Sequence, residues 1–423
     1  MIKIMKRGEV SESELFARKV SGADVAGTVA EIIADVRQNG DAALRKYNEK
    51  FDKCTCESLE VSEEEFAAAM AAVPAEYLRV LERSAGNIRE YHLRQVRHDY
   101  IVTAEDGSVL GQRVLPMARV GLYVPGGTAA YPSSVLMNCI PAKIAGVGEI
   151  VMTTPASGGE VSPAILAAAK VAGVDRVFKV GGAQAVAALA YGTESVPRVD
   201  KIVGPGNAFV AEAKRQVYGQ VAIDMIAGPS EILIVSDGKT NAKWLAADML
   251  SQAEHDKLAT AILITDSAAL AAEVAEEIER QLAALPREEI ARASIENNGK
   301  IIVAGDLEDA VAIANEIAPE HLELCVDAPF DYLGKVKNAG SIFLGRYSPE
   351  PVGDYLAGTN HTLPTMGTAR FSSPLSVDDF VKKSCFSYYT PAALEAAADD
   401  IALFADAEGL HGHAVSATIR REG

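Results

Sequence analysis

The stretch Lys201-Ile202-Val203-Gly204-Pro205-Gly206-Asn207 holds the pattern that decides the fold: a short apolar run, a glycine turn and the start of a helix. Three earlier apolar runs, at 120–124, 149–154 and 176–180, also end in turns that contain Gly or Pro. Short apolar strands that alternate with helices are typical of a parallel, doubly wound sheet. We therefore predict one such sheet between residues 120 and about 225.

A second series of apolar runs follows, with amphipathic helices between most of them. Its members are 231–235, 260–264, 300–303 and 340–344. They predict a second sheet, with a change of lobe near residues 225–231. Helix starts at Ser376 and at Thr390-Pro391 predict a small helical tail. Because the tail carries Glu408 and His413, we expect it to fold over a pocket, of this chain or of another subunit.

Composition limits the kind of protein and its partners. The chain has 423 residues, so more than one lobe is expected. Its net charge of −18 argues against nucleic acid and anionic membranes as partners. No apolar stretch is long enough to span a bilayer, and the first residues become charged too early for a signal peptide. Five sparse cysteines fit reduced thiols, so we expect a cytoplasmic protein, with Cys54-Thr55-Cys56 in a surface loop.

The glycine turns favour a phosphorylated ligand. They lie at strand ends, where the ligand crevice of an open α/β sheet is found, and helix starts expose amides that bind phosphate. Any one of them is explained as well by a tight turn. The dinucleotide fingerprint GxGxxG is absent, so spacing alone does not predict NAD.

Four segments gather polar side chains that can bind metal or move protons. Gln252 and His255 are three apart at the end of a helix and share a face, and with Asp354 and His413 they form a set of N and O donors. Glu320 and His321 follow Pro319 and are the best candidates for proton transfer. Each segment taken singly has a simpler explanation. Gln252 and His255 would be a surface pair, and Glu320 and His321 a helix cap. Asp354 would be a turn residue and His413 a solvated residue of the tail.

Taken together, these motifs resemble those of the histidinol dehydrogenase family over nearly the whole chain. The similarity is carried by segments 120–127, 181–192, 202–216, 224–231, 251–255, 318–322, 353–365 and 368–381. The resemblance implies oxidation of L-histidinol to L-histidine through histidinaldehyde, in histidine biosynthesis, with two NAD and one zinc ion per site.

The resemblance also implies roles for individual residues. Glu320 and His321 would be the catalytic bases, and Gln252, His255, Asp354 and His413 the zinc ligands. Tyr123, Gln184 and Asn207 would contact NAD. The substrate site would comprise Ser230, Gln252, His255, His321, Asp354, His361, Glu408 and His413. Since Glu408 and His413 are five apart, one straight helix would not place them on one face.

The fold implied is α/β, with two incomplete Rossmann-like parallel-sheet lobes and small helical extensions at both ends. Residues 1–20 would be an N-terminal extension, and 21–118 with 230–375 the lobe that carries the bases and most metal ligands. Residues 119–229 would form an inserted NAD-binding lobe. Residues 376–423 would complete the active site of the partner chain in a homodimer.

Three other functions compete with this one. A related zinc- and NAD-dependent enzyme would oxidise another primary alcohol, such as a sulfonated diol; the presence of Glu408 and His361 favours histidinol. A zinc-dependent hydrolase would use the same donors but would not need the glycine turns. A nucleotide-binding or scaffold protein would leave the polar cluster unexplained.

Overall fold

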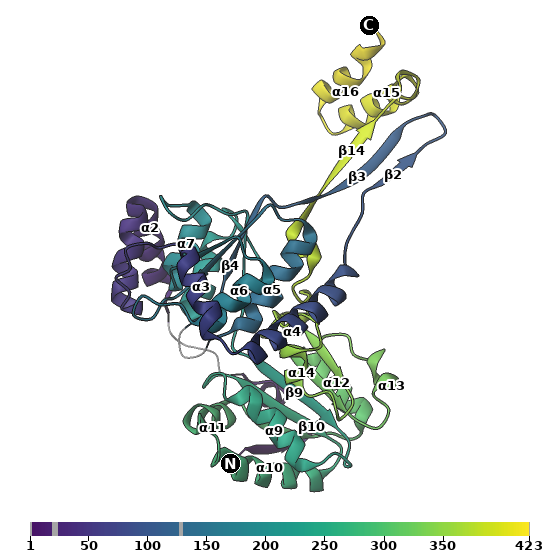
Figure 1. The fold of residues 1–423 in the computed structure, drawn as a ribbon. Coiled ribbons are helices and arrows are strands. Elements are labelled where there is room, and N and C mark those ends of the chain that lie inside the picture. The colour runs from purple at the N-terminus through teal and green to yellow at the C-terminus, as the bar shows by residue number, and fades with distance from the viewer. Residues whose placement is uncertain (1, 19–23, 127–129, 423) are drawn as a thin grey trace.

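The computed structural model describes residues 2–18, 24–126 and 130–422, which form two lobes and a long arm (Figure 1). Gly127, in the first of the expected glycine turns, lies outside the described residues. No helix of the described chain is long and apolar enough to cross a membrane. The α/β class with two parallel sheets, expected from the strand–turn–helix pattern, is confirmed.

The first lobe is built on a five-stranded parallel sheet with the order β6-β5-β4-β7-β8. Its strands are β4 (Arg119–Tyr123), β5 (Glu149–Thr154), β6 (Arg176–Lys179), β7 (Lys201–Val203) and β8 (Ala222–Ile223). The helices that follow them are α5 (Pro132–Ala145), α6 (Pro163–Ala172), α7 (Gly182–Tyr191) and α8 (Ala208–Val217). Leu136 of α5 and Leu189 of α7 belong to separate apolar clusters, so each face of the sheet is covered.

The second lobe is built on a six-stranded parallel sheet with the order β1-β11-β10-β9-β12-β13. Its strands are β1 (Lys3–Lys6), β9 (Glu231–Ser236), β10 (Thr260–Thr265), β11 (Lys300–Val303), β12 (His321–Cys325) and β13 (Ser341–Leu344). Its helices are α1 (Glu12–Leu15), α9 (Ala242–Ala253), α10 (Ala268–Leu282), α11 (Glu288–Asn297), α12 (Leu307–Ile317), α13 (Pro329–Leu333) and α14 (Glu350–Tyr355). Every residue of β9 and β10 is buried, as expected for central strands covered on both faces.

The helices of residues 26–93 pack on the first lobe, and the last of them also bonds to the second lobe through Ser84 and Asn87. They are α2 (Ala26–Tyr47), η1 (Asn48–Asp52), α3 (Glu63–Ala72) and α4 (Ala75–Leu93). They contact α5, α6, α7 and α8 of the first lobe. Apolar packing holds them there, because Val29 and Val36 of α2 belong to the same hydrophobic cluster as Leu189 of α7. Gly40 kinks α2, with a φ of 50° that glycine adopts without strain.

Both ends of the chain contain the expected helices, and each also contains a strand that was not predicted. At the N-terminus, β1 pairs with β11 and completes the edge of the second sheet. Near the C-terminus, β14 (Val381–Tyr388) pairs along its whole length with β3 (Val109–Pro116), which also pairs with β2 (Tyr100–Thr103). The segment Cys54-Thr55-Cys56 is a loop with Thr55 exposed, as expected, but Cys54 is buried, with its Sγ 2.9 Å from that of Cys56.

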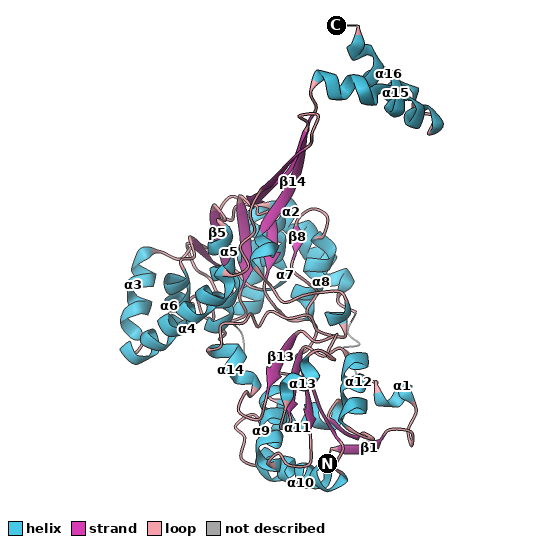
Figure 2. Cartoon of the chain, turned by 90° about the vertical axis from the view of Figure 1, so that its right-hand side faces the viewer, coloured by secondary structure: helices cyan, strands magenta, loops and turns pink. Residues whose placement is uncertain are grey.

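The arm consists of β2, β3, β14 and the two helices that follow, α15 (Pro391–Ala407) and α16 (His411–Thr418). It leaves the first lobe as a twisted antiparallel ribbon and holds α15 and α16 well away from both lobes (Figures 1 and 2). Three short helical turns complete the structure: η2 (Thr368–Arg370), η3 (Val377–Phe380) and η4 (Ile419–Arg421).

Candidate active site

The candidate catalytic pair lies where β12 begins. Helix α12 ends at Ile317, Ala318 takes a left-handed conformation with φ 50°, and Pro319 and Glu320 lead into the strand at His321. The Nδ1 atom of His321 is 2.9 Å from the carbonyl oxygen of Glu231, and Oε2 of Glu320 accepts a 2.8 Å hydrogen bond from the Glu231 amide. One residue at the start of the neighbouring strand therefore holds both candidate bases.

Burial shifts the pKa values of His321 and Glu320 in opposite directions. Burial lowers the pKa of His321 to about 4, so the ring is neutral at pH 7. Burial also raises the pKa of Glu320 well above its ordinary value, and the carboxylates of Glu231 and Asp354 raise it further. The imidazole is therefore unprotonated at pH 7, and the carboxyl is a stronger base than an exposed one once it is ionised, so both groups have a free acceptor site for proton transfer.

Asp354 on α14 is the centre of a second polar group. Its Oδ1 lies 3.2 Å from Nδ1 of His361. Burial alone would raise the pKa of Asp354, but His361 and His321 lower it, so the carboxylate is charged. The Nε2 atom of His361 is 3.2 Å from the Ser134 hydroxyl at the start of α5, which joins the two lobes at this point.

Glu350, which the sequence did not single out, lies between these two groups. Its Oε1 is 3.7 Å from Nε2 of His321, and its side chain hydrogen-bonds Asp354. Burial, together with Asp354, raises its pKa to about 10. His321, Glu350 and Asp354 offer ligand atoms that all lie within 4.8 Å of one another, so they could hold a metal ion. Glu350 was missed because nothing in its local sequence separates it from a residue of a helix first turn.

Gln252 and His255 lie at the end of α9, as predicted. Gln252 is buried, and its Oε1 has no hydrogen-bond partner among the described residues. Burial lowers the pKa of His255, which keeps the ring neutral, and Asp354 is near enough to oppose that effect. An unpaired amide oxygen and a neutral imidazole beside a charged carboxylate fit a divalent cation of borderline softness.

The structure does not bring Glu408 and His413 of the same chain to this group. Both are exposed on the arm, Glu408 at the end of α15 and His413 on α16 (Figure 2). The chain turns at Gly409, with φ 75°, between the two helices, which supplies the bend that their spacing requires. The Nδ1 atom of His411 is 2.9 Å from Asp406, so this neighbouring histidine has a local partner.

Three predicted cofactor contacts lie at the carboxyl ends of the first sheet. Tyr123 ends β4 and its hydroxyl accepts a 3.1 Å hydrogen bond from the Gly182 amide. Gln184 is buried, and both polar atoms of its side chain lack a partner among the described residues. Asn207 caps α8 by accepting from the Phe209 and Val210 amides. Ser230 and the catalytic pair lie instead at the amino ends of the second sheet.

The chain is similar to known proteins over nearly its whole length. A family model described as histidinol dehydrogenase matches residues 17–421. The histidinol dehydrogenase of Clostridium acetobutylicum is 53% identical over 99% of each chain, and one from Bacillus cereus is 58% identical over 93% of this chain and 92% of its own. The crystal structure of histidinol dehydrogenase from Elizabethkingia anophelis superposes with a TM-score of 0.95 at 38% identity, covering 100% of this chain and 98% of the other.

The chain belongs to the histidinol dehydrogenase family. It is therefore an oxidoreductase, as the sequence resemblance implied. Within this histidinol dehydrogenase fold, the polar cluster around His321 and Asp354 is the candidate active centre, and it contains a group that could hold metal.

Proposed function

We propose that this enzyme of histidine biosynthesis oxidises L-histidinol to L-histidine through histidinaldehyde, using two NAD in sequence and one zinc ion. The proposal is carried by one observation within a chain whose residues 17–421 match the family model: the backbone of Glu231 contacts the side chains of both Glu320 and His321. Oxidation of an alcohol to an acid removes two hydrides and adds one water, so it needs groups that accept protons at two stages.

His321 is proposed to take the hydroxyl proton of the alcohol. Because a carbonyl oxygen can only accept, Nδ1 of His321 must carry the hydrogen in its contact with Glu231. The neutral ring then has its lone pair on Nε2, the atom that faces Glu350. Burial keeps the pKa of His321 at about 4, so this acceptor is available at neutral pH.

Glu320 is proposed to act at the aldehyde stage by taking a proton from the water that adds to the carbonyl. A carboxyl whose pKa is raised by burial is a stronger base once it is ionised. The resulting diol would then lose its second hydride. Bound NAD would accept each hydride.

Zinc is proposed to be held by Gln252, His255 and Asp354 of one chain with His413 of a second copy. The support is the unpaired Gln252 oxygen, the neutral His255 and the charged Asp354 described above. Bound zinc would anchor the substrate's imidazole and amine and keep the aldehyde from escaping. Ser230, His361 and Glu408 would line the rest of the substrate site, with Glu408 also supplied by the second copy.

A homodimer with exchanged arms is proposed because the arm exposes apolar side chains that a second copy can cover. Ile101 is 65% exposed, Leu403 74% and Phe404 70%. Ile101 lies on β2 and the other two on α15, and exposed apolar surface gathered on one part of a molecule marks an interaction surface. The same exchange would carry His413 and Glu408 to the partner's site, which the arm's own chain does not reach (Figure 1).

A mixing experiment tests the exchange directly. His321→Asn and His413→Asn variants are each expected to be inactive, but when they are co-refolded, half of the dimers combine one of each and have one intact site. About a quarter of the wild-type activity should return. If each site were built from one chain, mixing would restore none.

Tyr123, Gln184 and Asn207 are proposed to contact NAD. The support is their position at the carboxyl ends of three parallel strands, together with the unpaired side-chain atoms of the buried Gln184. A cytoplasmic location is proposed as well, in keeping with the net charge of −18 and with five free cysteines.

The first test of the proposal is NADH formation from L-histidinol before and after chelation, with zinc added back. Two NADH per histidinol, lost on chelation and restored by zinc, are expected. A sulfonated diol or another primary alcohol serves as the comparison substrate. NADH from that alcohol and none from histidinol would overturn the substrate assignment, while NADH that survives removal of all metal would overturn the zinc assignment.

A further inference from the structure

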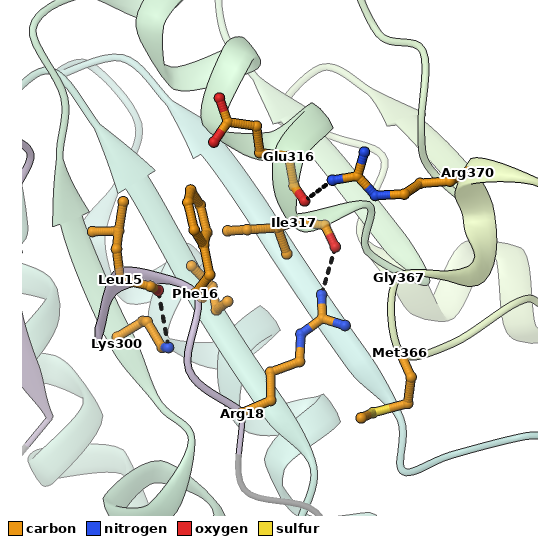
Figure 3. Close-up of a pocket in the computed structure, with 10 residues that line it drawn as sticks. Leu15, Phe16, Arg18, Lys300, Glu316, Ile317, Met366, Gly367 and Arg370 are labelled. Atoms are coloured by element: carbon orange, nitrogen blue, oxygen red, sulfur yellow. Dashed lines mark hydrogen bonds between the residues drawn. The ribbon is translucent and has the colours of Figure 1, made fainter. Parts of the chain in front are cut away.

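A cavity of about 370 Å³ lies beside the end of α12, which leads into Glu320 and His321, and beside the segment after α1 (Figure 3). Arg18, Ile317, Met366 and Arg370 are among the residues that line it. The proposed mechanism uses none of them. Arg18 nevertheless touches both chain segments that hold the candidate bases.

The guanidinium of Arg18 makes two contacts that converge on the active site. Nη2 donates to the carbonyl oxygen of Ile317 at 2.6 Å, three residues before Glu320. Nη1 lies 3.0 Å from Oε1 of Glu231, whose side chain is only 2% exposed. Figure 3 shows the Arg18 side chain crossing the cavity toward the end of α12.

The backbone around Arg18 is held independently. The Nζ atom of Lys300 donates to the carbonyl oxygens of Leu15 at 3.2 Å and of Ala17 at 2.7 Å. Since Lys300 begins β11 inside the second sheet, the segment that carries Arg18 is fixed to the core. The backbone of Arg18 is therefore fixed in place while its side chain contacts Ile317, at the end of α12.

Glu231 transmits this contact to the bases. Its side chain pairs with Arg18, while its amide and carbonyl hold Glu320 and His321. A buried carboxylate without a counter-charge is strongly unfavourable, so loss of Arg18 would force the start of β9 to shift or Glu231 to take up a proton. A shift of the Glu231 backbone would displace both bases together.

We propose that Arg18 is a positioning residue, which sets the reach of Glu320 and His321 through its ion pair with Glu231 and its bond to Ile317. The inference rests on the proposed roles of Glu320 and His321. It predicts a defect mainly in turnover, because none of the described contacts of Arg18 is to a residue proposed to bind substrate or NAD.

The test is the steady-state rate of histidinol oxidation by Arg18→Ala, with Arg370→Ala as the matched control. Arg370 lines the same cavity and donates to the Glu316 carbonyl, but none of its described contacts is to Glu231. We expect kcat to fall about 10- to 100-fold in Arg18→Ala. KM for histidinol and NAD and the bound zinc should stay within about twofold of wild type. Arg370→Ala should keep the wild-type kcat.

Chemical rescue separates positioning from general damage. Millimolar guanidinium should enter the cavity left by Arg18→Ala, replace the lost group and restore kcat in a saturable way, and it should leave Arg370→Ala unchanged. Arg18→Lys, which keeps the charge but not the two-pronged geometry, should have an intermediate kcat. It also serves as the test variant if Arg18→Ala does not fold. An unchanged kcat, or a loss that neither guanidinium nor lysine restores, would overturn the inference.

Two reference variants keep this result distinct from the proposed function. Glu320→Gln and His321→Asn are measured in the same assay. If they retain activity, the proposed roles of the bases fail. If they lose activity while Arg18→Ala does not, only the role of Arg18 fails.

Discussion

The Nδ1 atom of His321 lies 2.9 Å from the backbone carbonyl oxygen of Glu231, one strand away in the second sheet. This contact decides which ring nitrogen carries the hydrogen, and it leaves the lone pair on Nε2, the atom that we propose accepts the substrate proton. The neighbouring Glu320 is fixed by the amide of the same residue. Adjacent side chains of a strand normally point to opposite faces. Here Glu320 precedes the strand, so both groups can face Glu231.

Replacing His321 by Asn should lower kcat by about a hundredfold or more, with little change in KM for histidinol. Asn keeps a hydrogen-bond donor for the Glu231 carbonyl but cannot accept a proton. The measurement is steady-state NADH formation with histidinol as substrate. Glu320→Gln is the paired variant, and it should slow oxidation of added histidinaldehyde more than removal of the first hydride. Equal activity of His321→Asn and wild type would refute the role of this base.

Glu350 should make the metal-free protein less stable as the pH rises. Its pKa is about 10 in the folded chain against an ordinary 4.5, so between these values folding binds a proton that unfolding releases. The stability that Glu350 contributes is thus present below pH 4.5 and is lost as the pH rises toward 10.

Denaturant unfolding of the chelated protein at pH 5 and pH 8 measures this effect. Glu350→Gln copies the protonated carboxyl at every pH, so it should gain stability over wild type at pH 8 and much less at pH 5. Glu296→Gln, on an exposed site of α11, is the control and should show no such difference. The same pH response in Glu350→Gln and wild type would contradict the assignment.

His413 and His411 should differ in their effect on zinc, although they are two residues apart. His413→Asn is expected to reduce bound zinc about 10-fold or more, because it removes a proposed ligand. His411→Asn should retain it, since His411 is paired with Asp406 on the arm. Zinc per chain, measured by atomic absorption after dialysis against a weak chelator, checks this. Equal retention by the two variants would remove His413 from the ligand set.

Gly204→Ala should destabilise the first lobe and weaken NAD binding. Gly204 has φ +114°, and a Cβ there would lie 2.1 Å from the Tyr123 carbonyl oxygen. Gly219 has φ +97° with open space around it, so Gly219→Ala bears the backbone strain alone, about 1 kcal/mol. Gly204→Ala should cost about 3 kcal/mol or more. Unfolding curves and KM for NAD check this, and equal losses in the two variants would contradict the steric account.

Much of the fold could be predicted from local sequence. Alternation of apolar runs with glycine turns was sufficient for most strands of the two parallel sheets, because a strand buried on both faces is usually apolar along its length. It missed the two-residue β8, and it missed β12, which is fully buried although it contains His321 and Glu323. The pairing of β1 with β11 and of β14 with β3 was not predicted. In an edge strand or a ribbon, apolar and polar residues are mixed, and the pairing depends on a partner far away in the sequence. The surface that the helices of residues 26–93 cover could not be predicted either, because an apolar helix face does not specify its partner.

Residue identity and local spacing were enough to name the candidate bases Glu320 and His321, the candidate metal ligands Gln252, His255 and Asp354, and the family of the chain. How these groups lie relative to one another depends on the packing of segments that are far apart in the chain. The tertiary structure placed Glu350 beside His321 and Asp354, put Arg18 against Glu231, and held His413 away from the site of its own chain. The reason is physical: identity and spacing are properties of a segment, whereas burial, distance and the resulting pKa depend on which segments pack against one another.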